Sequence, residues 1–419
     1  MMDPHRPTAE GLFECVHAIV GAGPICDACL GRAFARLGHG LSNAQRGRAL
    51  RVAAVMLGSS GAAQAGRCWL CDGLFDRVEP WARRALDAVD GVAFDTYLFG
   101  VRLPIRVRQM EQFFDERFPT GWAEPLKHAF NREAGKAFER LAGHGTVDLT
   151  HPHLKFLLDI AADTVGCHVL SLYIYGRYRK LARGIPQTRW PCGRCGGRGC
   201  EACGFTGKQY LESVEELIAT PFLAASGSRQ AHLHGAGRED IDARMLGPGR
   251  PFVLEVEAPR IRDVDLSSLE AAVNAQAAGK VEVEGLRFVP RETVAWIKET
   301  RGEKAYRARV AFETEVASSA LDEALSALVG PIAQRTPARV SHRRADLVRK
   351  RRLLEAHGTL LAPREAGLEL RGEGGLYIKE LISGDDGRTE PSLAGRLGVG
   401  CRVLELDVVD VRLPEPDAR

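Results

Sequence analysis

The chain has 419 residues, of which 45% are hydrophobic and 26% are charged, and its formal net charge at pH 7 is only +3. This length allows two or three domains, and the composition is typical of a globular protein. There is no run of about 18 apolar residues and no apolar signal core near the N-terminus, which argues against membrane spans and secretion and predicts a cytoplasmic location. With so little total charge, any affinity for nucleic acid must come from local basic clusters.

The first part of the chain predicts a mixture of helices and strands. Asn43 is a candidate helix cap, and residues 58–66 are typical of a small-residue loop. Apolar spacing predicts helices over 43–57, 78–90, 106–118, 123–142 and 164–178, and strands over 94–104, 145–149 and 154–160. Periodicity alone leaves α/β and α+β open.

Eight of the 11 cysteines form two quartets. The first consists of Cys26, Cys29, Cys68 and Cys71, and the second of Cys192, Cys195, Cys200 and Cys203. Two Cys-x2-Cys turns can place four thiolates tetrahedrally around zinc, and glycines threaded through the second quartet permit sharp turns. Disulfides are the less favoured alternative in a chain expected to be intracellular, and an iron–sulfur cluster remains an option for the second quartet. We therefore predict two structural zinc sites.

Two segments concentrate basic residues. The first runs from Tyr173 to Trp190 and mixes tyrosines with Arg177, Arg179 and Lys180, as phosphate pairing with base stacking requires. The second contains Arg343, Arg344, Arg349, Lys350, Arg351 and Arg352. Both have a plain alternative, which is a core tyrosine stripe with solvated arginines for the first segment and a solvated charged face for the second.

From about residue 210 onward, the chain reads as strands with a few helices. Ser267 is a candidate cap for a helix ending near Gly279. Alternation predicts strands over 252–258, 305–313, 367–371, 374–382 and 401–412. Within the last of these, Leu404, Leu406 and Val408 alternate with Glu405 and Asp407, which predicts one apolar face.

The most informative segment is Gly-Arg-Glu-Asp-Ile-Asp-Ala-Arg-Met-Leu-Gly, residues 237–247. It packs three acids and two arginines between glycines, just before a predicted strand. A lone segment of this kind is usually a surface turn whose charges pair with one another. The whole string, however, resembles the catalytic loop of the pseudouridine synthases, specifically the archaeal-type tRNA synthase family that modifies the TΨC arm. The resemblance implies that Asp240 is the catalytic nucleophile, with Asp242 as the main rival and Glu239 as a weaker one.

Other strings resemble the same family in the expected order: residues 176–188 before the second quartet, 304–310, and 374–389. They imply that Tyr306 stacks on the target base, that Tyr377 contacts substrate and that Leu406 walls the pocket. Tyr377 and Lys379 are expected on one strand face. Lys379 is the candidate cation for Asp240, and Arg238 is the alternative cation.

The resemblance covers most of the chain and implies an α+β protein. A zinc-binding, THUMP-like tRNA-binding domain is expected over 1–185, a zinc knuckle over 186–209, and a catalytic domain with a mixed, largely antiparallel sheet over 210–419. The implied activity is isomerisation of uridines 54 and/or 55 in tRNA, with a flipped-out base and no cofactor for the chemistry.

Two alternatives stay open at this point. One is a THUMP-bearing tRNA enzyme of another chemistry, such as methyl transfer or thiolation. The sequence contains no Gly-x4-Gly-Lys-Ser/Thr motif, and Gly21-Ala22-Gly23 is only a fragment of a nucleotide-binding loop, which argues against a nucleotide cofactor. The other is a non-catalytic, zinc-dependent tRNA-binding protein. No protein partner is inferred.

Overall fold

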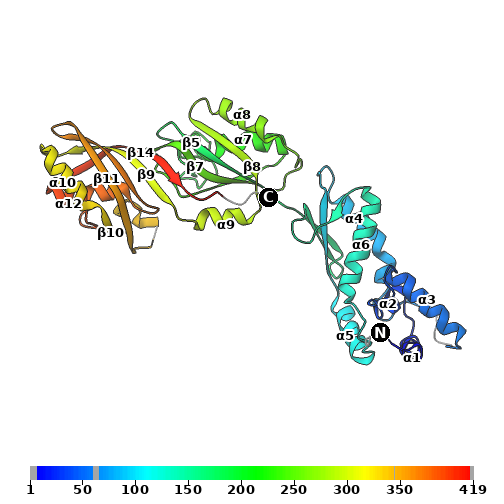
Figure 1. The fold of residues 1–419 in the computed structure, drawn as a ribbon. Helices are drawn as coiled ribbons and strands as arrows, with labels where there is room; N and C mark the ends of the chain where they lie inside the picture. Colours follow the sequence, from blue (N-terminus) through cyan, green and yellow to red (C-terminus); the bar gives the residue numbers. More distant parts are fainter. Residues whose placement is uncertain (1–6, 60–65, 344, 416–419) are drawn as a thin grey trace. The chain divides into compact units, whose positions relative to one another are not determined.

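A computed structural model describes residues 7–59, 66–343 and 345–415, with the side chains of residues 342 and 343 excepted. The chain divides into two compact units, Met1–Leu170 and Ser171–Arg419 (Figure 1). None of the helices in the described ranges is long and apolar enough to cross a membrane.

The first unit consists of helices packed with a small mixed sheet. Its helices are α1 (Ala9–Gly21), α2 (Asp27–Arg32), α3 (Asn43–Met56), η2 (Leu74–Arg77), α4 (Val78–Asp87), α5 (Ile105–Arg117) and α6 (Leu126–Ala142). Its strands are β1 (Thr96–Arg102), β2 (Thr146–Val147), β3 (Leu154–Asp159) and β4 (Thr164–Val169), in the order β2-β1-β3-β4. β1 runs parallel to β2 and β3, and β4 is antiparallel to β3.

Aromatic side chains fill the core between this sheet and α6. Phe138 of α6 packs against Tyr97 and Phe99 of β1 and against Phe156 of β3, with ring centroids 4.8, 5.5 and 5.0 Å apart. Helices α2 and α3 pack so closely at Gly31 that only glycine fits there. A Cβ on Gly31 would lie 1.8 Å from a backbone oxygen of α3. This close packing fixes α2, which carries Cys29 of the first cysteine quartet.

The second unit is built on one large sheet. Its strands are β5 (Leu172–Lys180), β6 (Ala231–Gly235), β7 (Arg244–Val256), β8 (Val281–Phe288), β9 (Glu303–Phe312), β10 (Gly330–Arg335), β11 (Val348–Ala362), β12 (Glu365–Glu373), β13 (Thr389–Glu390) and β14 (Cys401–Arg412). Its helices are η3 (Glu201–Cys203), α7 (Val214–Ser226), α8 (Leu266–Gln276), α9 (Glu292–Glu299), α10 (Ser318–Leu328), η4 (Ala338–Arg343), α11 (Ile378–Ser383) and α12 (Leu393–Leu397).

The order of strands brings distant segments together. It is β13-β10-β11-β12-β9-β14-β7-β5-β8, with β6 pairing on β7. Every pairing in this sheet is antiparallel except one: β14 joins β7 in parallel, through Asp407 opposite Arg244 and Val408 opposite Met245. Strand β14, the last along the described chain, therefore lies between β9 and β7 and links two halves of the sheet.

Three expectations from the sequence differ from this fold. Residues 164–178 form β4 and most of β5 rather than a helix, because both segments complete backbone ladders, β4 with β3 and β5 with β7 and β8. The expected strand over 374–382 is instead the short helix α11, which buries Ile378, Leu381 and Ile382 at helical spacing. The domain limit expected at residue 185 differs from the division after Leu170, since β5 belongs to the large sheet.

Candidate active site and metal centres

The loop between β6 and β7 carries the three acids singled out in the sequence. Gly237 opens it with φ of 82°, a left-handed conformation that favours glycine. A Cβ at this position would also lie 2.6 Å from Nζ of Lys304. The loop closes in a turn in which the amide of Ala243 donates to the Asp240 carbonyl at 3.0 Å. The positive φ therefore favours glycine where the loop enters the site, and a side chain there would also displace the end of Lys304.

A buried polar cluster supports this loop from beneath. The side chain of Glu239 is fully buried and accepts from Nε of Arg250 at 3.0 Å and from the hydroxyl of Tyr178 at 2.8 Å. Lys180, equally buried, donates to the carbonyls of Ile185, Asp240 and Ile241 at 2.8, 3.1 and 3.2 Å. A buried charge is tolerated when it is paired and hydrogen-bonded. The cluster therefore ties the loop to strands β5 and β7.

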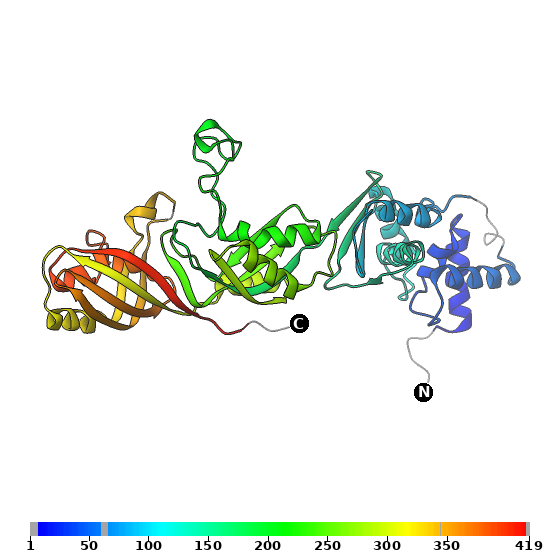
Figure 2. The ribbon, with the colours of Figure 1, turned by 90° about the horizontal axis from the view of Figure 1, so that it is seen from above.

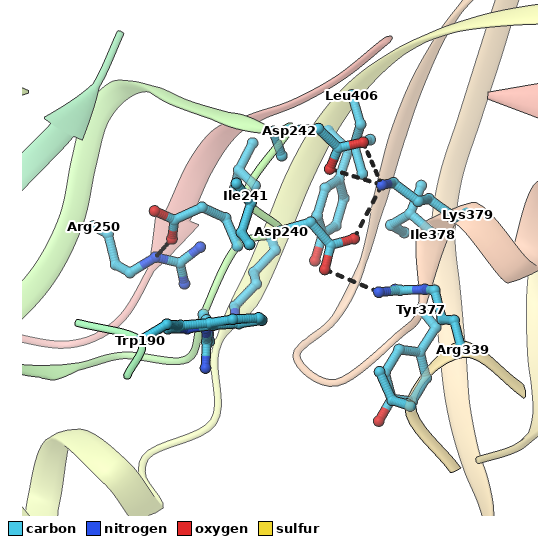
Figure 3. A pocket seen from close by; sticks show the side chains of 17 residues that line it. Trp190, Asp240, Ile241, Asp242, Arg250, Arg339, Tyr377, Ile378, Lys379 and Leu406 are labelled. Atoms are coloured by element: carbon cyan, nitrogen blue, oxygen red, sulfur yellow. Dashed lines mark hydrogen bonds and ion pairs between the residues drawn. The ribbon is translucent and has the colours of Figure 1, made fainter. Parts of the chain in front are cut away.

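Asp240 faces outward from the loop and lies between two cations. Its Oδ1 is 3.1 Å from Nη1 of Arg339, and its Oδ2 is 3.3 Å from Nζ of Lys379 (Figure 3). Arg339 is held in turn by Glu380, with Nε and Oε1 2.6 Å apart. Both contacts are ion pairs, and together they fix the position of the carboxylate. The pairing expected between Lys379 and Asp240 is thus present, but Lys379 is not its only cation.

Asp242 competes for the same lysine. Nζ of Lys379 donates to both of its carboxylate oxygens, at 2.8 and 2.7 Å, closer than to Asp240. Partial burial raises the pKa of Asp242, but the hydrogen bonds and charge of Lys379 lower it by more. The net shift of the pKa is therefore downward. The side chain of Asp242 is 69% exposed, against 31% for Asp240. Asp240 is therefore the more enclosed of the two.

These carboxylates open onto a cavity of about 470 Å³. Its walls come from seven segments: the chain at Trp190, the loop at 238–243, strand β7 at Arg250, strand β9, the 3-10 helix η4, the start of α11, and strand β14. Tyr306, Tyr377 and Leu406, the three expected substrate contacts, all line it. Burial raises the pKa of Tyr306 to about 12, so that its phenol stays protonated near neutral pH. The cavity is of a size that accommodates a small planar ligand.

The expected alternation along β14 is only partly correct. Leu406 and Val408 are buried and line the cavity, whereas Leu404 is exposed. Asp407, expected on a polar face, is buried and forms ion pairs with Arg244 and Arg183, each at 2.7 Å. Register shifts between Val403 and Glu405 and between Val408 and Asp410 break the two-residue period.

Sequence reasoning missed two cations of the cavity. Arg339 lies on η4, outside every motif, so no local signal identified it. Lys304 shares the buried face of β9 with Tyr306, and alternation along the quoted string 304–310 was a usable signal. Burial and the neighbouring guanidinium of Arg250 lower the pKa of Lys304 to about 7, against the opposing effect of Glu239.

The alternative cation, Arg238, has a different environment. Its guanidinium lies 5.1 Å from the ring centroid of Trp190, a cation–π distance. Trp190 lines the cavity directly before the second cysteine quartet. Arg238 therefore belongs to the aromatic wall of the cavity, and the carboxylate of Asp240 is paired with Arg339 and Lys379 instead.

The first basic segment has a mainly structural role. Lys180 is fully buried under the loop, so the phosphate contact expected of it is wrong. Arg177 donates to the carbonyls of Pro248 and Val411 at 2.7 and 2.9 Å, and Arg179 pairs with Glu282 at 2.9 Å. These contacts hold β5 against its neighbours.

The second basic cluster is more open. Lys350 and Arg352 are exposed on β11, whereas Arg349 donates to the Thr336 hydroxyl at 3.0 Å. Arg343 ends η4, and its side chain is not described. Arg344 lies outside the described residues.

The two cysteine quartets form two separate thiol clusters. In each, the four Sγ atoms lie within 4.8 Å of one another, and all eight thiols are free. Sulfur pairs such as Cys26 with Cys71 and Cys200 with Cys203 are 3.8 Å apart. Zn–S bonds of about 2.3 Å in a tetrahedron require S···S distances of about 3.8 Å. Both clusters therefore fit a four-coordinate thiophilic metal ion.

Backbone amides favour the thiolate form in the second cluster. The amide of Cys200 donates to Sγ of Cys203 at 3.2 Å and the amide of Gly207 donates to the same sulfur at 3.3 Å. The first of these hydrogen bonds is the main cause that lowers the pKa of Cys203 to about 6. Thiolates are the metal-binding form of cysteine.

Comparison with known proteins identifies the family. Residues 173–412 match the family model described as Pus10, C-terminal, and residues 81–159 match the Pus10 THUMP domain, archaeal. The tRNA pseudouridine synthase Pus10 of Halorubrum lacusprofundi is 47% identical over 411 residues, which cover 96% of this chain and 96% of the relative. The proteins of the same name from Methanothrix thermoacetophila and Methanocaldococcus jannaschii are 44% and 37% identical, covering 98% and 97% of this chain and 97% and 96% of theirs.

These matches confirm the family resemblance, because the THUMP model matches the first unit and the C-terminal model matches the second. The chain therefore belongs to the Pus10 family of tRNA pseudouridine synthases, which are isomerases.

Proposed function

We propose that this chain converts uridine to pseudouridine at positions 54 and/or 55 in the TΨC loop of tRNA, with Asp240 as the catalytic carboxylate. The observation that carries the proposal is the environment of Asp240. Its carboxylate is held between Arg339 and Lys379 at the wall of a cavity that Tyr306 and Leu406 also line. An ionised, partly enclosed carboxylate is the group that a nucleophilic step requires.

The chemistry is an isomerisation. The bond between the ribose carbon and N1 of uracil breaks, the base turns, and the same ribose carbon bonds to C5. A proton leaves C5 and N1 gains one, so atoms and electrons balance without a redox partner or added cofactor. The target base has to leave its stack to expose these atoms.

Several residues that line the cavity have a role in this scheme. Asp240 acts on the ribose carbon or on the base, and either attack uses the same ionised carboxylate. Lys379 and Arg339 hold that carboxylate in place. Tyr306 stacks against the flipped base, Leu406 closes the pocket beside it, and Tyr377 contacts the substrate. Lys350, Arg343 and Arg344 are proposed contacts to tRNA phosphates.

We also propose that both thiol clusters bind zinc as a structural ion, with Cys26, Cys29, Cys68 and Cys71 at one site and the remaining four cysteines at the other. Bound zinc would fold each pair of Cys-x2-Cys turns into one unit and take no part in the isomerisation.

A transcript assay tests the activity. Unmodified tRNA is incubated with the full chain without cofactor, and pseudouridine is mapped chemically at each uridine. Transcripts with cytidine at position 54 or 55 then assign the target: each lost signal identifies a modified position. Absence of pseudouridine at both positions with the native transcript would refute the proposed specificity.

Asp240→Asn tests the catalytic carboxylate. This change nearly preserves shape and removes the charge, so we expect tRNA affinity to persist and pseudouridine formation to fall by at least a factor of about 10³, as for loss of a catalytic nucleophile. Asp242→Asn is the matched control on the same loop and should keep most of its turnover. An active Asp240→Asn beside an inactive Asp242→Asn would show that Asp242 is the catalytic residue.

A further inference from the structure

The second cysteine cluster forms a knuckle, residues 191–209, that protrudes from the body of the second unit (Figure 2). Its base is closed directly beside the cavity. Pro191 pairs with Lys208, and the amide of Gln209 donates to the carbonyl of Trp190 at 2.9 Å. Because Trp190 lines the cavity, the base of the knuckle lies at the cavity wall.

The turn Cys200–Phe205 of the knuckle, here called its tip, ends in a strained aromatic residue. Phe205 has φ of 61°, directly after Gly204 at φ 56°. A left-handed conformation costs a non-glycine residue about 1–2 kcal/mol, and a bulky residue adopts it rarely. The turn itself requires this conformation, since it lets the amide of Phe205 donate to the Cys200 carbonyl at 2.9 Å. Glycine would satisfy the same turn without strain.

The side chain gains nothing inside the protein to offset this cost. Phe205 is 73% exposed as a residue, and its ring has no aromatic partner among the described residues. Strained residues that persist without an internal reason point to a functional constraint. An exposed aromatic face on a rigid support is a platform on which an unpaired base can stack.

The excess of positive charge on and next to the knuckle indicates a negatively charged partner. Between residues 189 and 209 the basic side chains are Arg189, Arg194, Arg198 and Lys208, and the single acid is Glu201. Arg194 and Arg198 are exposed, whereas Lys208 is paired with Glu216. Guanidinium groups beside an aromatic platform match a nucleic-acid strand, in which phosphates alternate with bases.

We propose that the tip of the knuckle binds unpaired nucleotides of the substrate tRNA: Phe205 stacks on one base, and Arg194 and Arg198 contact the flanking phosphates. This inference rests on the proposed function for the identity of the RNA. It makes the knuckle a recognition element that holds the strand beside the cavity while the target nucleotide is inside.

Phe205→Gly separates recognition from folding, because glycine relieves the strain while deleting the ring. The full chain with its metal bound is titrated with a fluorescent tRNA transcript under conditions without turnover. Loss of one stacked base should raise the Kd by about 5- to 150-fold. Metal content should stay the same, and the unfolding temperature should be equal or higher.

Three further measurements complete the test. Phe205→Trp, which keeps an aromatic platform, should bind within a factor of about three of the native chain, well below the loss expected for a missing stack. Leu361→Ala removes another exposed apolar side chain, from the β11–β12 end of the unit, and should leave the Kd unchanged. Arg194→Gln with Arg198→Gln should flatten the salt dependence of binding by up to about two units.

A native Kd for Phe205→Gly would overturn the proposal, as would an equal loss in Leu361→Ala. Binding and turnover are read separately, so the two proposals fail differently. A native chain that binds tRNA through Phe205 but forms no pseudouridine contradicts the proposed function alone.

Discussion

Lys180 offers the sharpest test of how the catalytic loop is held, because two interpretations of this residue predict opposite results. As a phosphate contact, its loss would weaken tRNA binding. As the buried anchor seen in the structure, its loss would loosen the loop that carries Asp240. Lys180→Met preserves length and apolar stem while deleting the ammonium group.

The expected cost follows from its hydrogen bonds. The carbonyls of Asp240 and Ile241 keep backbone donors, Ala243 and Gly184, when the ammonium is removed. The Ile185 carbonyl has no second donor among the described residues. Glu239 also keeps Arg250 and Tyr178. One orphaned buried carbonyl costs about 1–3 kcal/mol, so we expect the free energy of unfolding to fall by about 2 kcal/mol.

Activity should fall more than affinity. A displacement of the loop by about 1 Å would reduce the single-turnover rate by about 100-fold. Urea unfolding, single-turnover pseudouridine formation and the salt dependence of tRNA binding are measured on the full chain. Arg179→Gln, on the same strand and partly exposed, is the control and should change stability by less than about 0.5 kcal/mol. Native stability in Lys180→Met, with a salt slope lowered by about one unit, would refute the anchoring role.

Three other predictions concern the metals, the cavity and the basic cluster. Elemental analysis of protein purified without chelator should find about two metal ions per chain, and Cys192→Ser should lose one; eight freely titratable thiols with no metal would contradict this. Because the pKa of Lys304 is lowered from 10.5 in the unfolded chain to about 7 in the folded one, the unfolded state binds more protons between these values, and stability rises with pH there. Lys304→Met should abolish that rise. The free energy of unfolding of the variant minus that of the native chain should therefore be about 3 kcal/mol larger at pH 6 than at pH 9. An equal difference at both pH values would exclude the pKa shift. Lys350→Gln with Arg352→Gln should flatten the salt dependence of tRNA binding by up to about two units, whereas an unchanged slope would make these residues a solvated face.

Local sequence predicted the elements whose stability is local. Strand 401–412 was expected with the bounds that the structure gives it, and the helix over 43–57 forms as α3, capped by Ser42 rather than Asn43. Both cysteine quartets form clusters, because their spacing alone brings the thiols of each pair together. The loop at 237–247 was identified as a unit because its charged residues are contiguous.

Prediction failed where tertiary pairing decides the outcome. Residues 164–178 have apolar spacing compatible with a helix, yet their valines and tyrosines favour strands and two sheets offer partners. Alternation predicted a strand over 374–382, although the buried positions of α11 follow a helical period. Arg339 reaches Asp240 across 99 residues of sequence, and no local pattern encodes that contact. The burial of Lys180 depends on strands β7 and β8, which lie far from it in the sequence. The local pattern therefore indicated an RNA ligand instead.

The place of β14 has a consequence for synthesis of the protein. A ribosome makes the N-terminal part of a chain first, and domains generally fold as units once their residues have emerged. Here the strand that is made last of the large sheet fills its middle, between β9 and β7. Until it arrives, both neighbouring strands expose unpaired edges, which invite association with other chains. The nascent protein is therefore prone to aggregate through these edges until β14 inserts. Chaperones that shield strand edges should matter most during that interval.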